Sequence, residues 1–304
     1  MSAARGDGGR VNGPPDAGTP PADIPLAAAP RGWEAKLDLG FARRGDRSVL
    51  AHRRHTGPLV VQKSLHPEGP GVCQAIVVHP PGGIVGGDRL LLSIDVGAGA
   101  HAQLTTPGAA KWYRSPGLTA SQAIEADVGA AATLEWLPQE TILFDGAHAE
   151  LSTTVTLAAD ATLLAWDIVR LGRVASGERF ARGTYRQRFE VVRDGALIWA
   201  ERAVLDAGDG LATSPVGLNG CTMFGTFIAV APTVPDGLVA ACRAVAPPAA
   251  GGFESAVTHL PGMVIARCRG NSPEAARQWF AAVWAELRPA LCARPAMPPR
   301  IWNT

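Results

Sequence analysis

The chain has 304 residues, enough for one large all-β unit or two ordinary domains. Its 28 lysines and arginines nearly balance 27 aspartates and glutamates, so neither nucleic acid nor an anionic membrane is expected as a partner. No run approaches the roughly 20 apolar residues that cross a bilayer, and the N-terminus lacks the apolar core of a secretion signal. We therefore expect a cytoplasmic protein. Five scattered cysteines without a Cys-x-x-Cys pair argue against a structural zinc site and a disulfide framework.

Residues 1–31 differ in composition from the rest of the chain. They consist mainly of Gly, Pro, Ala and Asp and include almost no large apolar side chains. Such a segment buries too little surface to offset its conformational entropy, so we expect a disordered N-terminal tail. Residues 32–304 are expected to form a single β domain with a small helical annex.

A β pattern begins at Trp33, where apolar and polar residues alternate up to Leu39. Short runs bounded by Gly, Pro or Asp continue to about residue 230 and predict strands. These runs include 59–61, 75–78, 134–137, 141–144 and 184–192. Similar turn sequences also recur at 95–100, 127–132 and 157–163, at offsets of 32 and 29 residues. The recurrence favours stacked β layers in a solenoid-like arrangement, although a sandwich of hairpins would give a similar pattern.

Two helices are expected near the C-terminus, and the first covers 237–246. The second begins after Ser272, a suitable N-cap, has Pro273 in its first turn and should end before Pro289. Its aromatic residues Trp279 and Trp284 recur at helical spacing. They either form an interface with a partner or cover the end of the β stack.

Polar side chains concentrate where the predicted strands end. The segment 79–88 cannot be helical, because it contains two prolines and four glycines. It places His79 at one end and Asp88 at the other end of a shaped turn. Three further polar segments are 105–111 with Thr105, Thr106 and Lys111, 136–147 with Glu140 and Asp145, and 171–180 with Glu178. Each segment is as typical of a turn or an exposed ion pair as of a functional site. Glu140 and Asp145 should point to opposite faces of their strand.

Familiar catalytic motifs are absent from the sequence. It has no Gly-x-Ser-x-Gly elbow, no His-Glu-x-x-His pair and no dinucleotide-binding glycine fingerprint. Residues 108–111 lack the rest of a phosphate loop. Pairs of carboxylates would suit a β-solenoid hydrolase acting on carbohydrate, but only two tyrosines are available to stack on sugars. The dispersed oxygen donors and imidazoles better suit weak, transient handling of a divalent cation.

Four segments in order, 79–88, 105–111, 137–146 and 172–178, resemble the motifs of the urease accessory protein UreD family, called UreH in some systems. The resemblance extends from Trp33 to the C-terminal helix. It implies an all-β-rich fold, an irregular β-helix-like stack of many short strands with about two C-terminal helices. It also implies a non-enzymatic maturation factor. Such a protein binds the urease apoenzyme and recruits UreF, which carries the GTPase UreG, for GTP-dependent nickel delivery.

The resemblance further implies a path for transient Ni²⁺ in place of a tightly bound cofactor. Matching motif positions give Asp88, Glu140, Asp145, Glu178 and His79 as candidate metal ligands, and Thr105, Thr106 and Lys111 as path-lining or structural residues. Isolated oxygen ligands release nickel, whereas a cage of Cys and His would retain it. Two alternatives stay open: a docking adaptor without a metal path, and the carbohydrate hydrolase considered above.

Overall fold

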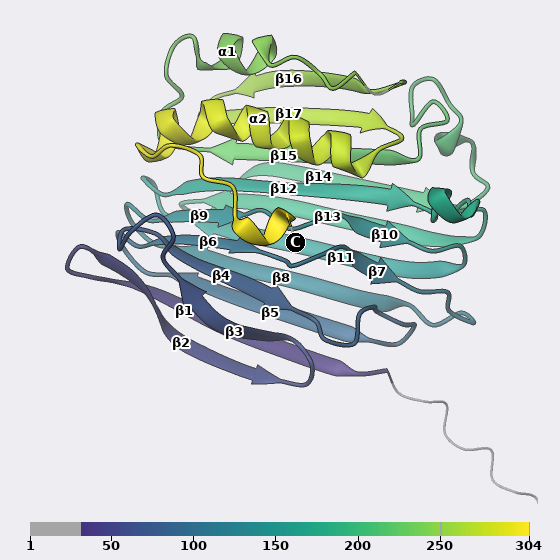
Figure 1. The fold of residues 1–304 in the computed structure, drawn as a ribbon, viewed down its shortest axis with the longest axis horizontal. Helices are drawn as coiled ribbons and strands as arrows, with labels where there is room; N and C mark the ends of the chain where they lie inside the picture. The colour runs from purple at the N-terminus through teal and green to yellow at the C-terminus, as the bar shows by residue number, and fades with distance from the viewer. Residues whose placement is uncertain (1–31, 250, 304) are drawn as a thin grey trace, which may run out of the picture. The chain divides into compact units, whose positions relative to one another are not determined.

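Two β-sheets lie face to face in the computed structural model, which describes residues 32–249 and 251–303 (Figure 1). The predicted disordered tail, 1–31, lies outside the described residues. The seven-stranded sheet has the order β14 (Ala196–Asp206), β13 (Gly183–Arg193), β11 (Ala147–Leu157), β8 (Ala120–Val128), β5 (Arg89–Val96), β1 (Glu34–Arg44) and β2 (Arg47–Thr56). The ten-stranded sheet has the order β16 (Glu254–Leu260), β17 (Met263–Gly270), β15 (Met223–Val230), β12 (Thr162–Leu171), β9 (Thr133–Trp136), β6 (His101–Thr105), β4 (Cys73–Val78) and β3 (Val60–Leu65). In that sheet β10 (Thr141–Leu143) pairs with β12 and with β7 (Ala110–Trp112).

The middle of the molecule is a stack of repeating coils. β5, β8 and β11 are parallel neighbours in one sheet, and β6, β9 and β12 are parallel neighbours in the other. The recurring turn sequences connect the sheets, and backbone hydrogen bonds join successive turns. Gly99 N–H donates to Ala130 O (2.8 Å), and Ala158 N–H donates to Val128 O (2.9 Å). The predicted solenoid-like stack is therefore confirmed, and antiparallel strands extend it at its edges.

The main core fills the space between the sheets, because each strand alternates buried and more exposed side chains. In β1, the inward residues Ala35, Leu37, Leu39 and Phe41 are at most 2% exposed. Burying one Leu or Phe side chain stabilises the fold by about 1.5–3 kcal/mol. A slip of one residue would expose all four side chains, so the alternation fixes the register of the strand.

Two helices, α1 (Leu238–Ala244) and α2 (Pro273–Cys292), pack against the outer face of the ten-stranded sheet (Figure 1). They close a second core, in which Trp166 and Phe227 of the sheet pack against Phe280 of α2. The sheet is therefore buried on both faces where α2 crosses it.

The start of α2 agrees with the sequence. The hydroxyl of Ser272 accepts a hydrogen bond from the backbone N–H of Ala275 (3.2 Å), as expected of an N-cap. Pro273 occupies the first turn, where its missing N–H costs no helical hydrogen bond. Within the described ranges, neither helix has the length and apolar character needed to cross a membrane.

The predicted end of α2 before Pro289 is wrong, because the helix continues to Cys292. The proline ring removes one helical hydrogen bond and crowds the preceding turn. The neighbouring Arg288 offsets this cost. Its buried guanidinium donates to the carboxylates of Glu135 and Glu68, at 3.0 Å each, and so holds the last turns of the helix against the sheet.

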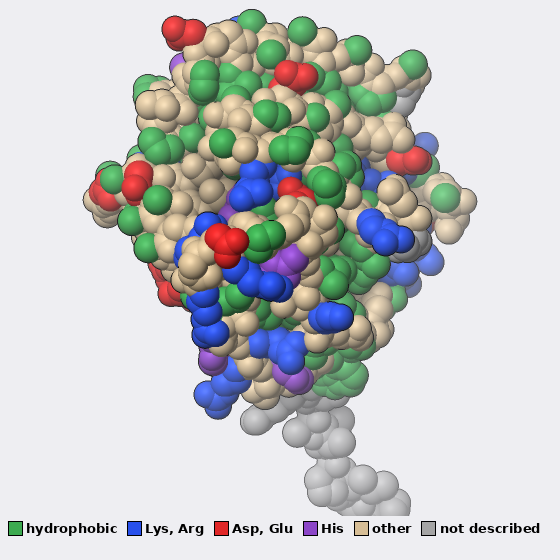
Figure 2. Space-filling model, turned by 60° about the vertical axis from the view of Figure 1, so that its left-hand side comes forward, with side chains coloured by type: hydrophobic (Ala, Val, Ile, Leu, Met, Phe, Trp, Pro, Cys, Tyr) green, Lys and Arg blue, Asp and Glu red, His purple; other side chains and the backbone are tan. Residues whose placement is uncertain are grey.

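Charged side chains are unevenly distributed over the surface. Figure 2 shows Lys and Arg side chains, with histidines among them, gathered over the lower half of one face. β1, β2 and β3 lie in this lower part of the molecule in Figure 1. The exposed cations of these strands and the turn between them include Arg43, Arg44, Arg47 and Arg54.

Candidate functional site

The polar segments of the sequence meet at one end of the ten-stranded sheet. β4, β6, β9 and β12 run parallel, so the loops after their C-terminal ends lie next to one another. Short pairings across these loops join Trp112 to Ile84 and to Leu143, and Leu143 to Leu171. We call this group of segments, 79–88, 106–112, 137–146 and 172–182, the loop cluster.

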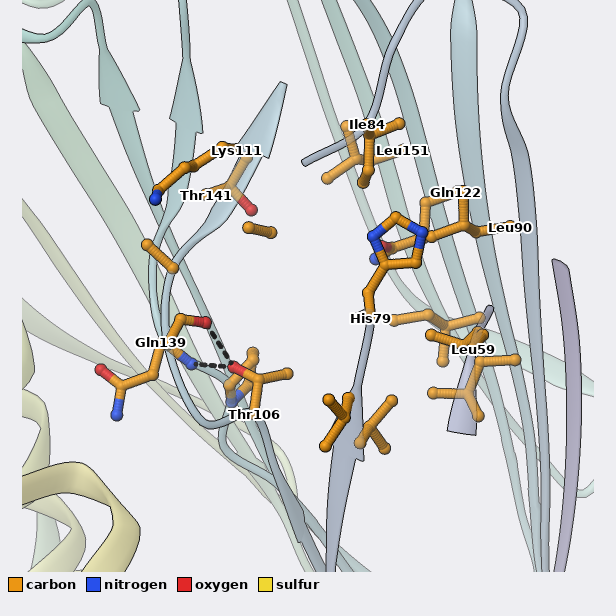
Figure 3. A pocket seen from close by; sticks show the side chains of 18 of the residues that line it. Leu59, His79, Ile84, Leu90, Thr106, Lys111, Gln122, Gln139, Thr141 and Leu151 are labelled. Carbon is orange, nitrogen blue, oxygen red and sulfur yellow. Dashed lines mark hydrogen bonds between the residues drawn. The ribbon is translucent and has the colours of Figure 1, made fainter. Parts of the chain in front are cut away.

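A cavity of about 300 Å³ lies beside the loop cluster, between the two sheets. Figure 3 shows His79 on one side of it and Lys111 and Gln139 on the opposite side. Apolar side chains such as Leu90 and Leu151 line much of the remaining wall. A cavity of this size has room for several water molecules wherever polar groups can bind them.

Polar side chains continue from the cavity to an edge of the two sheets. Asp167 of β12, Thr226 of β15 and Arg267 of β17 are neighbours in register across the ten-stranded sheet. Glu201 of β14 accepts hydrogen bonds from Thr226 (3.3 Å) and Arg267 (2.8 Å) across the space between the sheets. Glu201, Thr226 and Arg267 also line a second hollow of about 370 Å³. We call Asp167, Gln187, Glu201, Thr226 and Arg267 the polar row, because they link the cavity to the second hollow.

Asp167 supplies the one carboxylate among the described residues that line the cavity. Burial and the nearby negative charge of Glu201 raise its pKa to about 7, although a hydrogen bond from Nε2 of Gln187 (2.9 Å) acts in the opposite direction. Its carboxyl group therefore changes charge near neutral pH. A cation that binds to the protonated fraction must displace the proton.

Sequence reasoning missed Asp167 because its strand is otherwise apolar. The run Leu163-Leu164-Ala165-Trp166-Asp167-Ile168-Val169 is typical of a strand buried on both faces. The available signal was the carboxylate itself, since an unpaired charge inside such a run is costly and calls for an explanation.

Asp145 and Glu178, two predicted path residues, lie together in the loop cluster. The N–H of Asp145 donates to Oε1 of Glu178 (3.1 Å). Arg182 Nε donates to Asp145 (3.1 Å), and Arg173 donates to Glu178 (2.6 Å). These hydrogen bonds lower the pKa of both carboxyl groups. A cation must therefore displace an arginine to reach either side chain.

Asp88 and Glu140 lie apart from that pair. Asp88 is 3% exposed and accepts hydrogen bonds from the backbone N–H of Trp33 (2.8 Å) and Val85 (2.9 Å), so its carboxylate shapes the turn. Glu140 lies 3.8 Å from a guanidinium nitrogen of Arg277 on α2. None of the four predicted acids is among the residues that line the cavity, because each is held by backbone or arginine donors at the loop ends.

His79, Thr106 and Lys111, three further predicted residues, do line the cavity. Burial lowers the pKa of His79, although the charge of Asp88 opposes this effect, so the imidazole is neutral at pH 7 and able to bind a metal. The hydroxyl of Thr106 accepts a hydrogen bond from Gln139 N–H (2.9 Å) (Figure 3).

Thr105 has a structural position instead. It is fully buried, donates to Leu137 O (2.6 Å) and accepts from the indole of Trp302 (2.8 Å), which ties the C-terminal segment to the sheet. In the described part of the chain, no group of three or more His, Cys, Asp or Glu side chains is arranged to hold a metal ion.

Trp279 and Trp284 of α2 are buried, at 2% and 0% exposed. Trp284 donates to Oε2 of Glu135 (2.8 Å), and Trp279 donates to Val245 O (3.4 Å). Both rings belong to the core between α2 and the ten-stranded sheet. The aromatic surface of both side chains is therefore buried within the chain. This agrees with the alternative from the sequence in which they cover part of the β stack.

Comparison with known proteins gives a family for the chain. The family model described as UreD urease accessory protein matches residues 34–303. The chain is 56% identical to the urease accessory protein UreD of Dechloromonas aromatica (strain RCB) over 275 residues, 90% of this chain and 95% of that protein. It is 52% identical to UreD of Azoarcus sp. (strain BH72) over 279 residues, 92% of this chain and 97% of that protein. The resemblance inferred from the motifs is confirmed, and the chain belongs to the UreD family of urease accessory proteins.

Proposed function

We propose that this chain is a non-enzymatic scaffold of urease maturation and that Ni²⁺ passes between its two sheets on the way to the urease apoenzyme. The observation that carries the proposal is the position of Asp167, where the cavity meets the polar row. The role in maturation rests on the family of the chain. The route inside the molecule rests on the geometry of the cavity, the polar row and the second hollow.

The proposed route uses ligands that are weak one by one. At the loop cluster, the neutral imidazole of His79 accepts the ion, while the cation Lys111 on the opposite side of the cavity opposes its retention. Asp167 binds Ni²⁺ only as it loses its proton. Glu201 follows, where the ion competes with the guanidinium of Arg267. No residue on this route would bind nickel tightly enough to retain it.

A route with two openings needs a donor at one and an acceptor at the other. We propose that UreF, with UreG bound to it, occupies one opening in the cytoplasm and that the urease apoenzyme occupies the other. A docking adaptor without a metal path would form the same complex. Only the fate of nickel distinguishes the two functions.

Replacing Asp167 by Asn tests the route. Asp167→Asn keeps the shape of the side chain and removes its charge, so we expect the complex with UreF, UreG and urease to form while the nickel content of urease falls about tenfold. Nickel is measured by elemental analysis of urease purified after GTP-dependent activation. Asp127→Asn is the matched control, because Asp127 is an exposed residue of β8 that lies outside the cavity and the polar row.

Two outcomes would contradict parts of the proposal. Normal nickel loading in Asp167→Asn leaves the docking adaptor as the function. Loss of the complex in Asp167→Asn, but not in Asp127→Asn, assigns Asp167 to assembly and removes it from the route.

A further inference from the structure

A group of cations around β2 forms no salt bridges within the described residues. Arg43, Arg44, Arg47, Arg53, Arg54 and Lys63 are all exposed, and we call them the basic edge. In the described part of the chain none of the six forms a salt bridge, whereas ten other arginines do. The whole chain has 27 acidic residues for 28 basic ones, so a shortage of acids does not explain the difference.

The charge of the basic edge is therefore left to act on the surroundings. Like charges gathered on one side repel one another and create a positive potential over that surface. Arg47 contacts the ring of His66, and Arg53 donates to the carbonyl oxygens of Val61 and Gln62 on β3. These contacts hold the guanidinium groups in place without neutralising them. An acidic partner would be attracted and oriented by them.

The backbone of β2 is also open on this side. β2 pairs with β1 alone. At Ser48 the loop before β4 covers the outer side, where Ser48 N–H donates to Pro70 O (2.9 Å) and His66 lies 2.8 Å from Ser48 O. At Leu50 the backbone hydrogen-bonds the thiol of Cys73, and from Ala51 to Thr56 no described backbone group bonds to this outer side of the strand. An extended peptide could add there as a further strand.

We propose that the basic edge binds an acidic, extended segment of a partner protein, which adds as a strand beside β2. Single strands of nucleic acid are recognised by aromatic side chains that stack on bases, and residues 43–66 include no Phe, Tyr or Trp. A charged edge also protects a sheet from unwanted pairing. Protection needs charge of either sign, however, and gives no reason for six cations to stay outside salt bridges when Asp38 lies opposite Arg54 and Asp46 precedes Arg47.

Binding of a labelled acidic peptide to the full-length protein tests the proposal. The probe is a fluorescein-labelled peptide of about eight residues that alternates Glu and Val, the length of an ordinary strand. We expect salt-sensitive binding in fluorescence anisotropy and a loss of roughly tenfold or more in affinity for Arg54→Glu/Lys63→Glu. The matched control is Arg179→Glu/Arg186→Glu, which changes the net charge equally at two exposed arginines elsewhere. The control should lose less than about threefold, and Arg54→Lys should bind like the parent.

Further peptides separate strand addition from simple charge attraction. A version with Pro in place of each Val lacks the backbone N–H at every second residue and disfavours a regular paired strand, so it should bind much more weakly. The proposal fails if the proline peptide binds as well, if both charge-reversal variants weaken binding equally, or if the parent does not bind the acidic peptide at low salt. Tighter binding of a single-stranded oligonucleotide with equal charge would assign the surface to nucleic acid. Nickel delivery does not enter this inference, so its outcome is separate from that of the proposed route.

Discussion

Asp167 differs from the carboxylates of the loop cluster in how its surroundings set its ionisation. A carboxylate with a pKa of about 7 is ionised in part of the population at neutral pH, so both its neutral and its charged form are present where the proposed route passes. Asp145 and Glu178 have lowered pKa values and stay ionised, but arginines hold both of them. All three groups are carboxylates, so their pKa values differ because of their surroundings: burial beside Glu201 for Asp167, and hydrogen bonds from arginines for Asp145 and Glu178.

The ionisation of Asp167 should be visible in the stability of the protein. Between pH 4 and pH 7 the folded chain holds a proton at Asp167 that the unfolded chain has lost, so this residue makes the free energy of unfolding fall as pH rises. Asn cannot ionise. We expect Asp167→Asn to match the parent near pH 4 and to exceed it by on the order of 2 kcal/mol at pH 8, since water in the cavity screens part of the cost. Urea unfolding at both pH values measures this, and parallel pH profiles for the two proteins would contradict it.

At the residue scale, the sequence identified the loop motifs but not what each side chain does. The turn chemistry of 79–88 was predictable from its prolines and glycines. That Asp88 would be used by the N–H groups of Trp33 and Val85 was not predictable, because Trp33 is far away in the sequence. The arginines that hold Asp145 likewise come from distant positions, Arg114 and Arg182.

At the scale of single elements, α2 depends on contacts with parts of the chain that precede it by more than a hundred residues. Glu135 of β9 is fully buried and accepts hydrogen bonds from His101, Trp284 and Arg288. Burial alone would raise the pKa of Glu135, but His101 and Arg288 lower it overall and keep the group ionised. Local sequence predicted the N-cap of α2, whereas its C-terminal turns depend on this ionic network. That is why the predicted end at Pro289 was wrong.

Removing one partner from the Glu135 network should cost more than removing both. Arg288→Met removes the guanidinium that donates to two carboxylates, Glu135 and Glu68, and we expect the free energy of unfolding to fall by roughly 3–5 kcal/mol. Glu135→Gln/Arg288→Met also removes the charge of Glu135 and should recover part of that loss, because only Glu68 is then left without this guanidinium. Urea unfolding of the parent, the single variant and the double variant measures the difference. A double variant as unstable as Arg288→Met would show that packing, and not charge, holds the helix.

For the whole molecule, the recurring turn sequences predicted the stack of coils, because each coil repeats the same small-residue turn. The alternation of apolar residues predicted which faces meet in the core. Neither pattern predicted the cavity, because its walls combine residues from both sheets and the loop cluster, such as Leu90, Lys111 and Thr153. The cavity exists because these side chains do not fill the space between the sheets, and this depends on packing in three dimensions.

Filling the cavity is therefore the direct test of a route between the sheets. Thr153 of β11 is 8% exposed and lines the cavity, whereas its neighbour Thr154 points to the other face of the sheet. Thr153→Trp should place a bulky ring in the cavity and leave Asp167 unchanged, at an overpacking cost of about 1–3 kcal/mol. We expect it to form the complex with urease and deliver several-fold less nickel, measured by elemental analysis of urease. Thr154→Trp is the matched control and should deliver nickel normally; equal nickel loading by the two variants would mean that the ion does not travel between the sheets.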